Sequence, residues 1–170
     1  MRKFWSLAAT VAALGFVNVA HAQEDYTPVN ISVRAGVALP LDSSLSDFGS
    51  PLLALGVEYQ LPRPLLSQGD SYVSLDYMTA NTLFSHGVVP FCLNQRFYLS
   101  NAKLGRRTYA FLGVGGAVID IDHSGVGLAA RGGFGADLGD AIFFEVAGLI
   151  TDKISGATAD SVAFYLGYRF

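Results

Sequence analysis

Two short polar stretches carry residue types that could act as a nucleophile, a base and an acid. Ser85 is followed by His86, and Asp122, His123 and Ser124 are consecutive. A serine nucleophile needs a histidine within hydrogen-bond reach and a carboxylate that orients the histidine. Neighbouring side chains on a strand point in opposite directions, so a triad would require two loops, for example Ser85 with His123 and Asp122. No recognised motif accompanies these residues, and we interpret them as polar turn residues, with catalysis as the alternative.

A second group of residues consists of charged side chains inside stretches that are otherwise apolar or small. Along these stretches large apolar side chains alternate at period two with small or polar ones, and the charges fall on the second face. Equal numbers of arginines and carboxylates suit a confined interior, because each ion can then have a partner of opposite charge. A buried ion without a partner carries a desolvation cost on the order of several kcal/mol. We interpret them as a structural plug of salt bridges; the alternative is a gated polar network or a narrow ion path. The predicted interior network consists of Arg34, Glu58, Asp76, Arg96, Arg131, Asp137, Glu145 and Arg169.

The elements that would position these charges are eight predicted strands. Each is about as long as one tilted crossing of a bilayer, and an even number brings both chain ends to one side. Eight strands enclose an interior just wide enough for side chains to fill. The register of the fifth strand stays ambiguous, because Gly113, Gly115 and Gly116 interrupt its alternation. The predicted ranges are 29–39, 52–60, 71–79, 88–99, 108–119, 125–138, 141–151 and 161–170.

The composition is unusual for a water-soluble domain. Of the 170 residues, 51% are hydrophobic and only 15% are charged, and the net charge of −3 does not suggest a nucleic-acid partner. The single cysteine, Cys92, excludes an internal disulfide. Arg2 and Lys3, an apolar run and Ala20-His21-Ala22 predict a signal peptide over residues 1–22, followed by one barrel domain over residues 23–170.

The last predicted strand ends the sequence on an aromatic residue. On one of its faces lie Val162, Phe164, Leu166, Tyr168 and Phe170. This segment resembles the C-terminal signature of bacterial outer-membrane β-barrel proteins, and the resemblance implies that Phe164, Leu166, Tyr168 and Phe170 are read by the barrel-insertion machinery. The whole predicted domain resembles the small eight-stranded barrels of the OmpA and OmpX type. The implied fold class is all-β, an antiparallel up-and-down transmembrane barrel.

The predicted strand ends suggest further features. Aromatic residues there could form the girdles that mark the two membrane interfaces, namely Tyr26, Tyr59, Tyr77, Phe97, Tyr109, Phe144, Tyr168 and Phe170. The loops on the side away from the chain ends carry Asp42, Asp47, Asp120, Asp122, Asp152 and Asp160, whereas the opposite end carries Arg63, Lys103, Arg106 and Arg107. Carboxylates could hold a divalent cation that bridges to lipopolysaccharide phosphates, although solvated turn residues are the simpler interpretation.

We therefore expect an exported, integral outer-membrane protein of Gram-negative type. Side chains should fill the interior of its eight-stranded barrel, so we do not expect an open pore. Its expected role is structural or a weak surface interaction. Expected partners are outer-membrane lipid or lipopolysaccharide and the insertion machinery, with a monomeric state and with no nucleic acid, cofactor, metal or catalytic residue. Three alternatives remain open: a lipid A-modifying deacylase or acyltransferase, a narrow porin-like pore, and a soluble lipocalin-like barrel whose apolar face surrounds a ligand.

Overall fold

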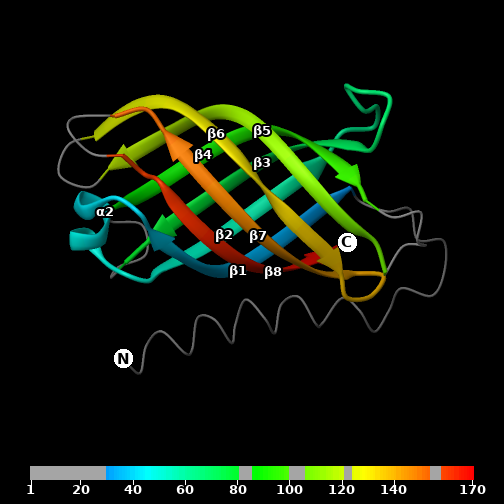
Figure 1. Ribbon diagram of the computed structural model, residues 1–170, viewed down its shortest axis with the longest axis horizontal. Helices are drawn as coiled ribbons and strands as arrows, with labels where there is room; N and C mark the ends of the chain where they lie inside the picture. Colours follow the sequence, from blue (N-terminus) through cyan, green and yellow to red (C-terminus); the bar gives the residue numbers. More distant parts are fainter. Residues whose placement is uncertain (1–29, 81–85, 100–105, 121–123, 154–157) are drawn as a thin grey trace.

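The computed structural model describes residues 30–80, 86–99, 106–120, 124–153 and 158–170, which form one closed barrel (Figure 1). Its eight strands run antiparallel in chain order, and the last pairs with the first. The predicted strand boundaries agree with the observed ones to within two residues, and the predicted fold class is confirmed. The strands are β1 (Ile31–Pro40), β2 (Leu52–Gln60), β3 (Asp70–Thr79), β4 (Gly87–Tyr98), β5 (Thr108–Asp120), β6 (Ser124–Asp137), β7 (Ile142–Thr151) and β8 (Ser161–Arg169).

A short helix, α2 (Ser43–Phe48), lies between β1 and β2 where the sequence predicted only a loop. Its first turn is closed by the amide of Ser46, which donates to the carbonyl of Asp42 at 3.0 Å. Leu45 is fully buried and belongs to the same apolar cluster as Ala38 and Leu52. Burial of the Leu45 side chain at this end of the barrel stabilises the helical turn, because it removes apolar surface from water.

None of the helices in the described part of the chain has the length and apolar character needed to cross a bilayer.

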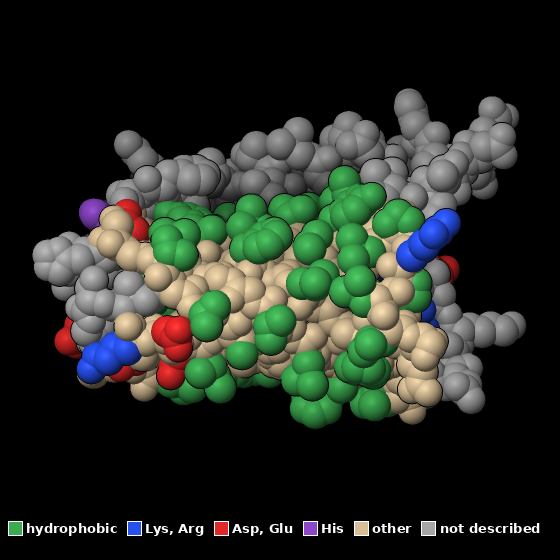
Figure 2. Space-filling view, turned by 90° about the horizontal axis from the view of Figure 1, so that it is seen from above, with side chains coloured by type: hydrophobic (Ala, Val, Ile, Leu, Met, Phe, Trp, Pro, Cys, Tyr) green, Lys and Arg blue, Asp and Glu red, His purple; other side chains and the backbone are tan. Residues whose placement is uncertain are grey.

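The barrel wall is apolar on the outside and polar on the inside. Val126 is 76% exposed and Phe134 is 66% exposed, whereas Arg131 is 4% exposed and Glu145 is fully buried. Figure 2 shows hydrophobic side chains over the middle of the wall and charged side chains gathered near its two ends. This arrangement contradicts the lipocalin-like alternative, in which the apolar face would point inward.

The structure resolves the ambiguous register of β5. Tyr109, Phe111 and Ile119 are buried inside, and Leu112 and Val114 are 67% and 68% exposed on the outer wall. Gly113 and Gly115, which lie between Phe111 and Ile119, face inward, where little space is left for a side chain. A Cβ at Gly113 would lie 2.1 Å from Asn94 Oδ1, and one at Gly115 would lie 1.9 Å from the carbonyl oxygen of Phe91. Gly113 and Gly115 are therefore needed for packing of β5 against β4, whereas a Cβ at Gly116 would meet the carbonyl oxygen of Gly127 on β6 at 3.3 Å.

One residue predicted for the aromatic girdles lies elsewhere. Tyr109 is fully buried in the barrel, because its alternation with Leu112 and Val114 directs it inward. Tyr59 and Phe144 lie on the outer wall, 42% and 39% exposed, and Tyr77, Phe97, Tyr168 and Phe170 are partly exposed. Tyr26 lies outside the described residues, as do residues 1–22 of the predicted signal peptide.

Candidate functional site

The centre of the barrel holds a cluster of six buried charged side chains, which we call the charge cluster. Its members come from six different strands and comprise the guanidinium groups of Arg34, Arg96 and Arg131 and the carboxylates of Glu58, Asp76 and Glu145. Each member is at most 4% exposed. The three positive and three negative charges balance, so the interior can bury all of them without a net charge.

Arg34 on β1 is the most connected member of the charge cluster. It forms ion pairs with Glu58, with Asp76 at 2.8 Å and with Glu145 at 2.9 Å. Towards Asp76 the contact is forked, since Nε donates to Oδ1 at 3.0 Å and Nη2 donates to Oδ2 at 2.8 Å. Such bidentate contacts balance the charge of a guanidinium group and also fix its orientation.

A glycine makes the contact between Arg34 and Asp76 possible. Gly56 on β2 pairs with Arg34 on one side and with Asp76 on the other. A Cβ at this position would lie 2.1 Å from Asp76 Oδ1 and 2.7 Å from Arg34 Nε. The absence of a side chain on the intervening strand therefore leaves the space in which the two charged groups meet.

Arg96 on β4 pairs with Glu58, with Nη2 donating to Oε2 at 3.1 Å. Its guanidinium carbon also lies 4.4 Å from the ring centroid of Tyr72 and 4.5 Å from that of Tyr109. Stacking between two aromatic rings holds a planar guanidinium group in place and fills the space around it.

Arg131 on β6 joins the other two carboxylates. It pairs with Glu145 and lies 3.5 Å from Asp76, and its Nη1 donates to Ser74 Oγ at 3.1 Å. The ring of Phe111 lies 4.9 Å from its guanidinium carbon. The three arginines thus connect strands on all sides of the interior, which is the arrangement expected of a plug.

The remaining two predicted network residues lie apart from the charge cluster. Asp137 and Arg169 form an ion pair at 2.6 Å near the end of the barrel where the chain terminates. Arg107 Nε also donates to Asp137, at 2.9 Å, and its guanidinium carbon lies 4.2 Å from the ring centroid of Tyr98. Arg107, expected only among the basic residues at this end of the barrel, thus forms an ion pair that the sequence did not predict.

Several further side chains in the interior were not predicted as part of the network, although the alternation of the strands places some of them on the inward face. Tyr72 lies two residues before Ser74 and four before Asp76, on the same inward face of β3. The rings of Tyr72 and Phe111 meet edge to face, with their centroids 6.4 Å apart. Aromatic rings therefore fill much of the space between the charged groups.

The candidate catalytic residues come together only in part. Ser85, Asp122 and His123 lie outside the described residues. Ser124 Oγ donates to Asp120 Oδ1 at 2.6 Å, and His86 Nδ1 lies 3.8 Å from Asp120 Oδ2. The carboxylate thus lies between the hydroxyl and the imidazole, whereas a nucleophilic triad needs the imidazole between the other two.

The two ends of the barrel differ in charge. The end that includes α2, which we call the α2 rim, carries Asp42, Asp47, Asp120, Asp152 and Asp160 together with Lys153. The end where the chain terminates, which we call the terminal rim, carries exposed Arg63 and Arg106, and one exposed carboxylate, Asp140, among the described residues. Within the described residues, no three histidine, cysteine or acidic side chains lie close enough together to hold a metal ion.

The C-terminal segment closes the barrel at the terminal rim. β8 pairs with β1 from Ser161 to Arg169, and the amide of Phe170 donates to the carbonyl of Ile31 at 2.9 Å. Phe164 and Leu166 are exposed on the outer wall, and the rings of Tyr168 and Phe170 meet edge to face with centroids 5.0 Å apart. The apolar face of the signature thus belongs to the outer surface.

Comparison with protein-family profiles and with curated protein sequences gave no match. Among solved structures, the chain is similar to the N-terminal β-barrel domain of Pseudomonas aeruginosa OprF, with a TM-score of 0.52 and 12% identity over 85% of this chain and 100% of that one. Neisserial surface protein A (NspA) gives a TM-score of 0.52 and 11% identity, covering 82% of this chain and 94% of that one. The outer membrane enzyme PagL gives a TM-score of 0.53 and 13% sequence identity, covering 82% of this chain and 98% of that one. The chain therefore has the eight-stranded barrel fold found in these outer-membrane proteins.

Proposed function

We propose that this protein is an integral outer-membrane β-barrel whose interior is plugged by the charge cluster, and that its role is structural or a weak surface interaction. The observation that carries the proposal is the distribution of side chains between the two faces of a closed barrel. Outward residues such as Leu128, 71% exposed, would meet acyl chains, while every member of the charge cluster is buried inside. A closed barrel also pairs its backbone groups within the wall, as the interior of a bilayer requires.

Delivery to the membrane forms part of the same proposal. Residues 1–22 would direct export and be removed, and the segment ending at Phe170 would be recognised by the insertion machinery. The similarity to outer-membrane barrels in solved structures supports the location through the fold. The monomeric state is proposed because the barrel closes on itself through β1 and β8.

Membrane extraction tests the location directly. The full-length protein should remain in the membrane fraction after carbonate or urea washing and should be released only by detergent. Unheated samples should migrate differently from heated ones on gels, because a closed barrel resists unfolding by the gel detergent. Release of folded protein into the soluble periplasmic fraction would contradict the proposal.

A further inference from the structure

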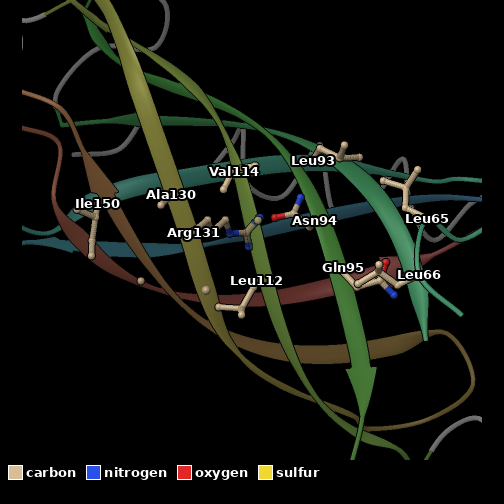
Figure 3. A pocket seen from close by; sticks show the side chains of 13 residues that line it. Leu65, Leu66, Leu93, Asn94, Gln95, Leu112, Val114, Ala130, Arg131 and Ile150 are labelled. Carbon is tan, nitrogen blue, oxygen red and sulfur yellow. The ribbon is translucent and has the colours of Figure 1, made fainter. Parts of the chain in front are cut away.

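The lipid-facing wall contains a groove with a volume of about 700 Å³ that runs across β4, β5, β6 and β7. Its sides include Leu112, Val114 and Ile150, and one end is bounded by Leu65 and Leu66 from the segment between β2 and β3. Figure 3 shows Leu65, Leu66 and Leu93 at one end of this groove and Ala130 and Ile150 at the other. Side chains on the outer wall thus leave a depression that extends from Leu65 and Leu66, at the terminal rim, toward Ile150 near the other end of β7.

Two glycines form part of the groove where the packing of the barrel does not require glycine. Gly132 and Gly148 are paired across β6 and β7. A Cβ at Gly148 would meet its nearest heavy atom at 3.6 Å, and one at Gly132 would meet the flexible end of Leu112 at 2.9 Å. By contrast, a Cβ at neighbouring Gly133, which faces inward, would lie 2.0 Å from the carbonyl oxygen of Val146. Glycine in a strand often marks the close approach of a ligand, and Gly132 and Gly148 keep the groove deep.

The segment that bounds the groove is fixed on the outer wall. The amide of Leu65 donates to Ser71 Oγ at 2.7 Å, and Gln95 Nε2 donates to the carbonyl of Gln68 at 2.7 Å. Ser71 and Gln95 are buried although both occupy outward positions of β3 and β4, because this segment covers them. Leu65 and Leu66 nevertheless remain 62% and 53% exposed, so the segment presents apolar side chains to whatever surrounds the wall.

A positive charge lies beside these leucines. Arg63 is exposed, stands two residues before Leu65 and is held between Pro62 and Pro64, which restrict the backbone. Among the contacts of the described residues, no ion pair engages Arg63, whereas Arg107 on the same rim is paired with Asp137. The acidic α2 rim would repel an anionic headgroup, whereas the exposed arginines of the terminal rim would attract one.

We propose that this groove binds one anionic phospholipid from the leaflet at the terminal rim, with an acyl chain along Gly132 and Gly148 and the phosphate at Arg63. Acyl chains are as apolar as the wall itself, so the groove supplies close packing rather than a hydrophobic driving force. The arginine supplies the preference for an anionic headgroup, because a basic side chain at a membrane surface attracts such lipids. The inference rests on the proposed insertion of the barrel into a bilayer.

Native mass spectrometry of the full-length protein, released from nanodiscs of matched acyl composition, tests this proposal. The nanodiscs would contain phosphatidylglycerol and phosphatidylethanolamine in equal amounts. We expect the wild type to retain one phosphatidylglycerol. G148L fills the groove and should abolish retention, whereas A35L adds the same side chain to an exposed position of β1 outside the groove and should not. R63A should lower the preference for phosphatidylglycerol by about fivefold, and K153A at the α2 rim should leave it unchanged.

The outcomes separate this inference from the proposed function. If the protein inserts and shows heat-modifiable mobility but G148L retains lipid as the wild type does, the groove is not a lipid site and the inference is overturned. Retention of both lipids in equal amounts would overturn the assigned headgroup. A dimer that forms in the wild type and disappears in G148L would show that the groove binds a second copy of the chain. That result would overturn the proposal that a lipid occupies it. Failure of the wild type to insert would instead contradict the proposed function.

Discussion

Arg34 on β1 and Glu145 on β7 form an ion pair with an Nη1–Oε1 distance of 2.9 Å, although 111 residues separate them in sequence. β8 lies between their strands, and the ring of Tyr165 on β8 lies 4.7 Å from the guanidinium carbon of Arg34. The pair therefore spans the seam at which the barrel closes. It links the interior charge cluster to the closure of the fold.

The pair between Arg34 and Glu145 should stabilise the barrel cooperatively with the rest of the charge cluster. R34M leaves Glu58, Asp76 and Glu145 with fewer positive partners and should lower the free energy of unfolding by about 3–5 kcal/mol. R34M combined with E145Q should cost less than the sum of the two single changes, by about 1 kcal/mol or more. Urea unfolding in lipid vesicles measures these differences. K153M, at an exposed position, serves as the control, and strict additivity would contradict a shared network.

Gly56 should be far less tolerant of a methyl group than Gly148. G56A would place a Cβ between Arg34 and Asp76 and should lower the free energy of unfolding by about 1–3 kcal/mol, as overpacking does. G148A on the outer wall adds the same group where the nearest heavy atom would be 3.6 Å away, and it should be neutral or stabilising. The same unfolding measurement decides the matter. Equal losses in both variants would show that the gap at Gly56 is not needed for the cluster.

The plugged interior predicts that the wild-type protein gives no steady conductance in planar bilayers. Arg96 and Glu58 are paired inside the barrel, and E58A with R96A removes their bulk while keeping the net charge. This double variant should show ion currents that the wild type lacks. Stable wild-type channels whose ion selectivity changes in R96A or R131A would favour the porin-like alternative.

The order of groups around Asp120 predicts that His86 and Ser124 do not catalyse modification of lipid A. Mass spectrometry of lipid A from cells that express the wild type, H86A or S124A should give the same acylation pattern. H123A extends the test to the other candidate histidine. An acyl group that is lost or gained only with the wild type would support the deacylase or acyltransferase alternative.

The sequence predicts the fold well because, along most strands, the alternation of apolar with small or polar side chains shows which residues face outward and which face inward. β6 alternates without ambiguity, with Val126 and Leu128 outward and Arg131 and Asp137 inward, and its predicted limits differ from the observed ones by one residue at each end. β5 was ambiguous because inward glycines carry no information about direction. Their role depends on atoms of β4, such as Asn94 Oδ1, which the local pattern does not contain.

The candidate site was predictable in membership but not in geometry. Alternation assigns Arg34 and Asp76 to one face, but their contact depends on the register of three strands and on the gap at Gly56. The separation of Asp137 and Arg169 from the charge cluster likewise follows from their height along the barrel. The burial of Ser71 and Gln95 on the outer wall could not be predicted, because it depends on how the segment from 61 to 69 folds over them.

The central claim is that one face of each strand meets acyl chains while the other encloses the charge cluster. Spin labels on single cysteines, introduced at Leu128 and Ala129 in a C92S background, test it in reconstituted vesicles. Leu128 is 71% exposed on the outer wall and Ala129 is 5% exposed on the inward face. Membrane-dissolved oxygen should relax the label at position 128 much more strongly than the label at position 129. Relaxation at 128 by a water-soluble nickel reagent, with little effect of oxygen, would contradict it.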